Sequence, residues 1–203
     1  MTLAFAVLGD SIGYGMGAAR PADALGPRLA AVLTASGIPT QTKVFAVSGA
    51  CSDALDGQAR QAAAWGAEVA LIVIGANDLT HFVPPQDAAE QLGAAVRTLR
   101  AGGAEVVVCP APDLSVVPWV PPQMRIMVRS ASALMRAAQV RVATADGARV
   151  VDAVAAMSTT FAEDPTLFSP DRFHPSSAGY ALIASALAPT VASAAADALR
   201  QAG

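Results

Sequence analysis

The sequence predicts an α/β fold, a three-layer α/β/α sandwich in which a parallel sheet of about five strands lies between helices. Short apolar runs suited to buried strands alternate along the chain with longer segments of helical periodicity. Strands separated by helices pair in parallel through right-handed crossovers, which places helices on both faces of the sheet. With 203 residues, of which 54% are hydrophobic, the chain fits a single domain, residues 1–203, with a sizeable core.

The chain opens with a strand, a helix and a second strand. Residues 3–8 form a short apolar run that ends at Gly9, as expected for a parallel strand buried on both faces. Residues 21–36 carry apolar side chains at helical spacing and stop at Gly37, a residue suited to the C′ position of a helix. Residues 42–47 then provide the second strand.

The middle of the chain repeats this alternation. A helix is expected over residues 52–65, with Ser52 or Asp53 as its N-terminal cap. A third strand over 69–74 is an uninterrupted apolar run that ends at a glycine. The next helix, over 85–100, is closed by two consecutive glycines.

The last part of the chain completes the pattern. A fourth strand is expected over residues 106–109, a long helix over 122–145 and a short fifth strand over 149–151. Residues 175–200 are expected to form the final helix. Proline lacks a backbone N–H, so Pro189 is expected to break or kink that helix.

Three small polar clusters directly follow expected strands. They contain Ser11 in Gly-Asp-Ser, Gly49 in Ser-Gly, and Asn77 in Gly-Ala-Asn-Asp. In sheets of this kind, ligands bind beyond the carboxyl ends of the strands. The three clusters are therefore expected to converge on one rim of the sheet.

A fourth cluster, Asp-Arg-Phe-His-Pro, lies near the end of the chain and completes a set of groups for nucleophilic catalysis. A serine that opens an ester needs a base, a carboxylate that orients the base, and hydrogen-bond donors for the oxyanion. Ser11, His174 and Asp171 can fill the first three roles. The backbone N–H groups of Ser11 and Gly49, with the side-chain amide of Asn77, can fill the fourth.

Each of these residues also has a simpler interpretation. Ser11 could cap a helix or belong to a glycine-rich anion-binding turn, His174 could be a solvated loop histidine, and Asn77 could be a turn residue. Asp10 and Asp78 are interpreted as acceptors for loop N–H groups. His81 is assigned to a loop or the rim rather than to the chemistry. No cluster of side chains has metal-ligand spacing, and the glycine pattern after the first strand lacks the lysine of a phosphate-binding loop.

The four clusters, in order and content, resemble the sequence blocks of the SGNH hydrolase superfamily, the GDSL esterases and lipases. This resemblance spans nearly the whole chain and rests on Ser11, Gly49, Asn77 and His174. It implies a flavodoxin-like sheet with strand order 2-1-3-4-5, which would bring Ser11 between Gly49 and Asn77. It also implies carboxylic ester hydrolysis through an acyl-enzyme on Ser11, without a cofactor.

The substrate is expected to be a small-molecule or lipid ester. The segment after the fourth strand is too apolar for an ordinary exposed loop, and it follows a strand at the active rim. It is therefore expected to line an acyl pocket, although it could instead cover the edge of the sheet. The candidate pocket residues are Val116, Val117, Trp119, Phe82 and Phe173, with Val83 and residues 161–168 as further wall candidates.

Composition limits the partners and the location. The formal charge is −3, and one lysine and twelve arginines are scattered without a cluster, so nucleic acid is not an expected partner. Every apolar run is broken by glycine, proline or a charged residue, so none is expected to reach the roughly 20 residues of a membrane span, and Ser11 lies too early for a signal peptide. We expect a cytoplasmic monomer or small homo-oligomer, although a mature secreted form would look the same. Cys51 and Cys109 are expected to be free thiols.

Other functions remain open at this point. A thioesterase, a lysophospholipase or an acyltransferase of the same fold would use the same triad. A non-catalytic lipid- or carbohydrate-binding protein would be expected to have lost part of it. A flavodoxin-like nucleotide binder would leave Asp171 and His174 without a purpose.

Overall fold

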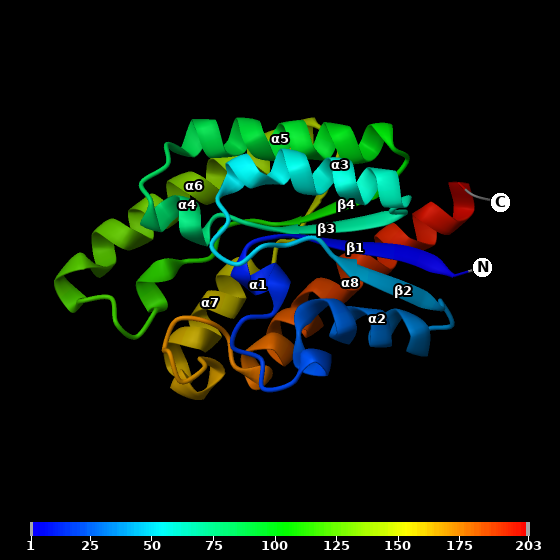
Figure 1. The fold of residues 1–203 in the computed structure, drawn as a ribbon. Coiled ribbons are helices and arrows are strands. Elements are labelled where there is room, and N and C mark those ends of the chain that lie inside the picture. The colour runs from blue at the N-terminus through cyan, green and yellow to red at the C-terminus, as the bar shows by residue number, and fades with distance from the viewer. Residues whose placement is uncertain (1, 202–203) are drawn as a thin grey trace.

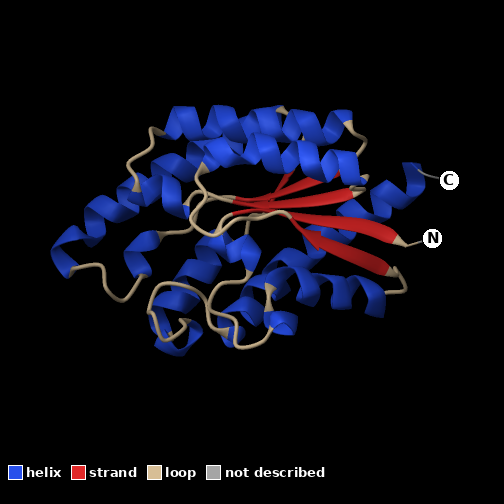
Figure 2. Cartoon of the chain, in the orientation of Figure 1, coloured by secondary structure: helices blue, strands red, loops and turns tan. Residues whose placement is uncertain are grey.

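The computed structural model describes residues 2–201 and places a parallel five-stranded sheet between two layers of helices (Figures 1 and 2). The strand order is β2-β1-β3-β4-β5, which confirms the predicted fold class and strand order. All neighbouring strands pair in parallel. The strands are β1 (Leu3–Gly9), β2 (Thr40–Val44), β3 (Val69–Val73), β4 (Glu105–Cys109) and β5 (Arg149–Val150).

Helices cover both faces of the sheet (Figure 1). One layer contains α3 (Leu55–Trp65), α5 (Pro85–Ala101) and α6 (Arg125–Ala145), and the other contains α2 (Leu25–Ala35), α7 (Val154–Glu163) and α8 (Ser177–Gln201). Two short helices, α1 (Ser11–Tyr14) and α4 (Ala76–Thr80), follow β1 and β3 at the carboxyl rim. The 3₁₀ turns are η1 (Pro21–Asp23), η2 (Ser52–Ala54), η3 (Leu114–Val116), η4 (Pro122–Met124) and η5 (Pro165–Leu167).

Strand β1 shows why the apolar runs become central strands. Successive side chains of a strand point to opposite faces of the sheet. Phe5 and Val7 therefore pack toward α2 and α8, whereas Ala6 and Leu8 pack toward α3 and α5. All four are fully buried, and burial of each large apolar side chain contributes roughly 1.5–3 kcal/mol. A continuous apolar run is stable only in this central position.

Several elements differ from the expected ones. Strand β2 covers residues 40–44 rather than 42–47, because the chain leaves the sheet edge where the N–H groups of Phe45 and Ala46 share the carbonyl of Val7. Helices α1, α4 and α7 were not predicted. Helix α8 continues through Pro189, so the expected break is wrong. Leu187 and Val191, on either side of that proline, are both fully buried and hold the helix on the sheet.

Helix α8 also corrects the expectation that no apolar segment is long enough to span a membrane. By length and composition alone, this 25-residue helix could cross one. In the structure its apolar residues belong to the core that it shares with α2 and the sheet. These core residues are Tyr180, Ile183, Ala184, Leu187, Val191, Ala194, Ala195 and Ala198.

The carboxyl ends of β1 and β3 meet at Gly9. Its φ is +122°, and a Cβ at this position would lie 1.8 Å from the carbonyl oxygen of Val73. Only glycine permits this approach. The buried amide of Gln58 accepts a hydrogen bond from the N–H of Gly9 at 2.7 Å and donates one to its carbonyl at 3.0 Å. The segment that leads to Ser11 is thus fixed before it leaves the sheet.

The two cysteines are free, as predicted. Cys51 lies in the loop after β2, and Cys109 is the last residue of β4. Strands β2 and β4 are separated in the sheet by β1 and β3.

Candidate active site

Ser11, His174 and Asp171 form one continuous hydrogen-bonded chain. Nε2 of His174 lies 3.0 Å from Oγ of Ser11, and Nδ1 of His174 lies 2.7 Å from Oδ2 of Asp171. Ser11 is separated from His174 by 163 positions in the sequence. The fold brings them together because β1 delivers Ser11 to the rim, while α8 begins directly after the loop that carries His174. With Nδ1 donating to the carboxylate, Nε2 can accept the proton of Ser11.

The loop around Asp171 is built to hold its carboxylate. Oδ1 accepts hydrogen bonds from the hydroxyl of Ser169 at 2.7 Å and from the N–H groups of Phe173 and His174 at 2.8 and 2.9 Å. Burial opposes ionisation of Asp171, but the bonds from His174, the two N–H groups and Ser169 outweigh it and hold the pKa well below its usual range. Asp171 therefore remains a carboxylate under mildly acidic conditions.

Ser11 begins the short helix α1 and is 4% exposed. Asp10 caps this helix by accepting a hydrogen bond from the N–H of Ile12 at 2.9 Å. Asp78 plays a similar part beside it, accepting from the N–H and hydroxyl of Ser52 at 2.9 and 3.0 Å. Both aspartates are buried, and both accept loop hydrogen bonds as expected from the sequence.

Three donors lie in loops or short helices beyond the ends of β1, β2 and β3. Within residues 2–201, the N–H groups of Ser11 and Gly49 donate to no other protein atom. Gly49 has a φ of +83° and is exposed. The amide of Asn77 donates one hydrogen to the carbonyl of Ala50 at 2.9 Å, which leaves its second hydrogen available. This pattern is what an oxyanion site requires.

His81 lies outside this arrangement, in agreement with the sequence-based expectation. Its Nδ1 is 2.8 Å from the carbonyl oxygen of Asn77, and the residue is exposed. No group of three or more metal-ligating side chains is present among residues 2–201.

Asp10 should make stability depend on pH. Burial, reinforced by the charge of Asp78, raises its pKa from 3.8 to about 7 despite the hydrogen bond from Ile12. Between about pH 4 and pH 7 the folded chain thus retains a proton that the unfolded chain releases, so stability falls as pH rises through this window, by on the order of 4 kcal/mol. Asp10→Asn, which cannot ionise, should lack this contribution.

Urea denaturation of both proteins from pH 4 to pH 8 measures the effect. The free energy of unfolding of Asp10→Asn minus that of the wild type should grow across the window. Groups that titrate in both proteins cancel in this difference. A difference that stays constant with pH would contradict the prediction.

Gly17 packs closely against the loop that carries His174. Its φ is +90°, and a Cβ at this position would lie 2.5 Å from the carbonyl oxygen of Pro175 and 3.0 Å from Cβ of His174. Gly17→Ala should therefore displace His174 and lower kcat about 100-fold, since misplacement by about 1 Å costs this much. Gly37→Ala is the matched control, because Gly37 has a φ of +85° with nothing within 4 Å. Equal kcat values for the two variants would refute this role for Gly17.

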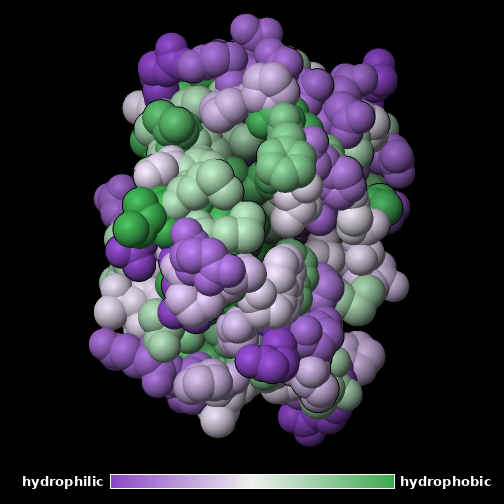
Figure 3. Space-filling view, turned by 90° about the vertical axis from the view of Figure 1, so that its left-hand side faces the viewer, coloured by the Kyte–Doolittle hydropathy of each residue, from purple (hydrophilic) through white to green (hydrophobic). Residues whose placement is uncertain are grey.

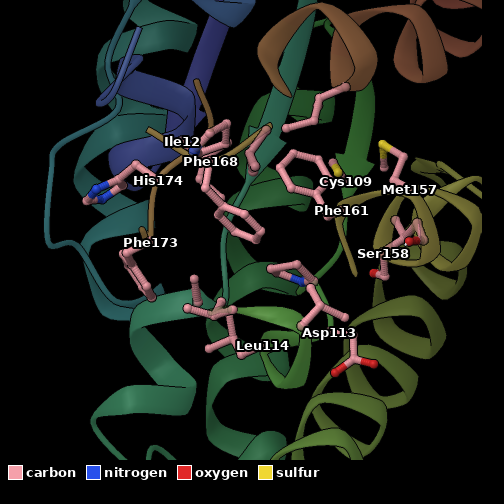
Figure 4. A pocket seen from close by; sticks show the side chains of 18 of the residues that line it. Ile12, Cys109, Asp113, Leu114, Met157, Ser158, Phe161, Phe168, Phe173 and His174 are labelled. Atoms are coloured by element: carbon pink, nitrogen blue, oxygen red, sulfur yellow. Dashed lines mark hydrogen bonds between the residues drawn. The ribbon is translucent and has the colours of Figure 1, made fainter. Parts of the chain in front are cut away.

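An apolar pocket with a volume of about 90 Å³ opens beside Ser11 and His174 (Figure 4). Figure 4 shows His174 on one side of this apolar pocket and Ser158 on the other, with the rings of Phe161 and Phe168 between them. The two rings meet edge to face, with centroids 5.1 Å apart. The pocket is thus a largely apolar compartment that begins at the serine.

The structure places only some of the predicted pocket residues in this wall. Val116, Val117 and Phe173 line it, and so do Phe161 and Phe168. Phe82 and Trp119 do not line the pocket: Phe82 is 89% exposed, and Trp119, which is 50% exposed, stacks against the lining residue Phe173. Val83 packs elsewhere, against the buried cluster of Ala88, Ala111 and Met135.

Sequence reasoning named Phe161 but missed the rest of the wall that α7 contributes. Val154 and Met157 recur at helical spacing with Phe161, and all three line the pocket. That spacing is the signal that could have revealed the helix. Ile12, Cys109 and Ile183 also line the pocket and were missed from the sequence, whereas Pro110, Pro112 and Leu114 belong to the segment that was expected to line it.

Comparison with known proteins identifies the family. A model of the GDSL-like lipase/acylhydrolase family matches residues 7–182. The chain belongs to this family. The resemblance drawn from the four sequence clusters is thereby confirmed.

The chain is similar in sequence to an esterase and similar in fold to several proteins of known structure. It is 34% identical over 190 residues to the GDSL-like esterase Rv1075c of Mycobacterium tuberculosis; the match covers 89% of this chain and 59% of that protein. The chain thus spans about three fifths of the length of that relative. The crystal structure of TesA has a TM-score of 0.76 at 19% identity, covering 92% of this chain and 97% of TesA.

A second structure, that of the psychrotrophic esterase EstA from Pseudoalteromonas sp., has a TM-score of 0.71 at 18% identity, covering 91% of this chain and 93% of EstA. These structural likenesses support the fold of the chain. The geometry of the site places a serine beside an oriented histidine, with backbone and amide donors and an apolar pocket around it.

Proposed function

We propose that the protein is a carboxylic ester hydrolase that works through an acyl-enzyme on Ser11. The observation that carries this proposal is the chain of hydrogen bonds from Asp171 through His174 to Ser11. A serine hydroxyl is a weak nucleophile until a base removes its proton, and the neutral Nε2 of His174 is placed to do so.

The reaction follows from these positions. Oγ of Ser11 bonds to the ester carbonyl carbon while its proton passes to His174, and the carbonyl electrons move onto the oxygen. The imidazolium then gives its proton to the leaving alkoxide as the C–O bond of the ester breaks. Water repeats the sequence on the acyl-enzyme and releases the acid and free Ser11.

Two further sets of groups assist these steps. The negative charge of Asp171 stabilises the imidazolium of His174 between the two proton transfers. The N–H groups of Ser11 and Gly49 and the free amide hydrogen of Asn77 would stabilise the oxyanion, and loss of one such donor costs on the order of 3 kcal/mol in comparable enzymes.

The apolar pocket favours a hydrophobic acyl group over an acetyl group. A series of p-nitrophenyl esters from acetate to palmitate tests this directly, and kcat/KM should rise from acetate to a medium chain length. Serine-dependent hydrolysis at any length supports the proposed chemistry. No hydrolysis of any ester by the folded protein would overturn it.

Met157→Trp tests whether the pocket holds the acyl chain. The indole would fill space at the pocket wall, so the ratio of kcat/KM for the octanoate to that for the butyrate should fall at least tenfold. Leu134→Trp is the matched control, since Leu134 is 65% exposed and does not line the pocket. An unchanged ratio in Met157→Trp would place the acyl chain elsewhere.

A further inference from the structure

A second, more polar cavity adjoins the apolar pocket at the end away from His174. This cavity, here called the distal groove, has a volume of about 400 Å³ and lies between α6, α7 and η3. Asp113, Val116 and Ser158 line both cavities. In Figure 4, Ser158 and Asp113 lie on the opposite side of the pocket from His174. A chain that enters at Ser11 therefore points toward the distal groove.

Two arginines of α6 line the distal groove, and they differ in their partners. Nε of Arg129 lies 3.5 Å from Oδ2 of Asp113 and 3.4 Å from Oγ of Ser115. Nε of Arg136 donates to the carbonyl of Ala111 at 3.2 Å. Within residues 2–201, Arg136 has no carboxylate within 4 Å. Its two terminal nitrogens are therefore available to a ligand.

The charge of Arg136 also affects the pKa of a residue in the wall of the apolar pocket. Burial raises the pKa of Cys109, which lines that pocket, to about 12, and the positive charge of Arg136 opposes this rise. Arg136 is itself half-buried, so water screens its charge less than it would on the open surface.

From this arrangement we infer that the distal groove binds a carboxylate at the far end of the acyl chain. The preferred acyl donors would then be half-esters of dicarboxylic acids, with the methylene chain in the apolar pocket and the free carboxylate at Arg136. This inference rests on the proposed function, because it names the acyl group that Ser11 would receive.

The chemistry of the groove favours a carboxylate over a neutral chain end. A guanidinium presents paired N–H groups that match the two oxygens of a carboxylate. A methyl group at the same place would lie against charged side chains and gain little from burial. Glu163 also lines the groove and would repel the anion, but it lies on the exposed side, where water screens it.

Mono-p-nitrophenyl esters of dicarboxylic acids with four to twelve carbons provide the test, each compared with the p-nitrophenyl alkanoate of equal length. At one or two chain lengths the wild type should favour the carboxylated ester about tenfold or more in kcat/KM, as expected for one charge-assisted contact. This preference should shrink as the salt concentration rises. Preference for the methyl-terminated ester at every length would overturn the inference.

Three variants locate the effect. Arg136→Gln should abolish the preference, and Glu163→Gln should increase it, because the first removes the attracting charge and the second removes the repelling one. Arg141→Gln is the matched control: Arg141 is exposed on the same helix, bonds to Gln86 and does not line the groove. It should leave the preference unchanged.

The two proposals fail in different ways. A preference that persists in Arg136→Gln, with Ser11-dependent hydrolysis intact, would overturn the distal carboxylate site alone. Absence of hydrolysis for both ester series would overturn the proposed function as well. Thermal unfolding checks that Arg136→Gln is folded. If it is not, Glu163→Gln still tests whether charge in the groove sets the preference, because Glu163 is exposed and its substitution should not disturb the fold.

Discussion

Ser11→Ala should lower kcat for a p-nitrophenyl ester by about a million-fold and leave the fold unchanged. The substitution removes only Oγ, the atom that lies 3.0 Å from Nε2 of His174. Without it, His174 has no hydroxyl to activate and no acyl-enzyme can form. The oxyanion donors and the pocket remain, so a small residual rate above that of water is expected.

Two measurements check this prediction. Steady-state hydrolysis gives the loss in kcat, and mass spectrometry after treatment with a fluorophosphonate should show one adduct on the wild type and none on Ser11→Ala. Ser36→Ala is the matched control, because Ser36 is exposed at the end of α2 and lines neither cavity. Substantial activity in Ser11→Ala would end the proposed mechanism.

His174→Ala should cost nearly as much as Ser11→Ala, whereas Asp171→Asn should cost about ten-thousand-fold in kcat. An asparagine can keep the hydrogen bonds that Oδ1 of Asp171 accepts from Ser169 and from the two N–H groups. Its amide would donate to Nδ1 in place of accepting from it. The histidine would then carry its proton on Nε2 and could not accept the proton of Ser11.

The ranking is tested by kcat values for the three variants at one pH. Asp164→Asn is the matched control, since Asp164 accepts similar local hydrogen bonds from Thr166 and lies outside the site. It should change kcat less than threefold. A loss in Asp171→Asn as small as in this control would assign the orienting role to another group.

The sequence alone was sufficient for the fold class and for the groups at the rim. Buried parallel strands demand continuous apolar runs, and the turns after them demand glycines, as at Gly9 and Gly75. Both requirements act on residues close together in the chain, so the sequence alone is enough to recognise them. The spacing of Asp171 and His174 is local too, because one loop holds both side chains. Ser11 and Asn77 could be placed on the same rim because the carboxyl ends of parallel strands share one edge.

Tertiary structure decided the pocket, the continuity of α8 and the distal groove. Phe82 and Trp119 were expected in the pocket for their apolar character, yet the structure leaves both exposed. Figure 3, which views the molecule from the left-hand side of Figure 1, shows that apolar side chains do gather among polar ones on the surface. Which way a loop side chain points depends on what packs behind it. Met157 lines the pocket because α7 packs beside η3. Arg136 lines the distal groove because α6 also packs against η3. Such contacts join distant segments, and no local pattern specifies them.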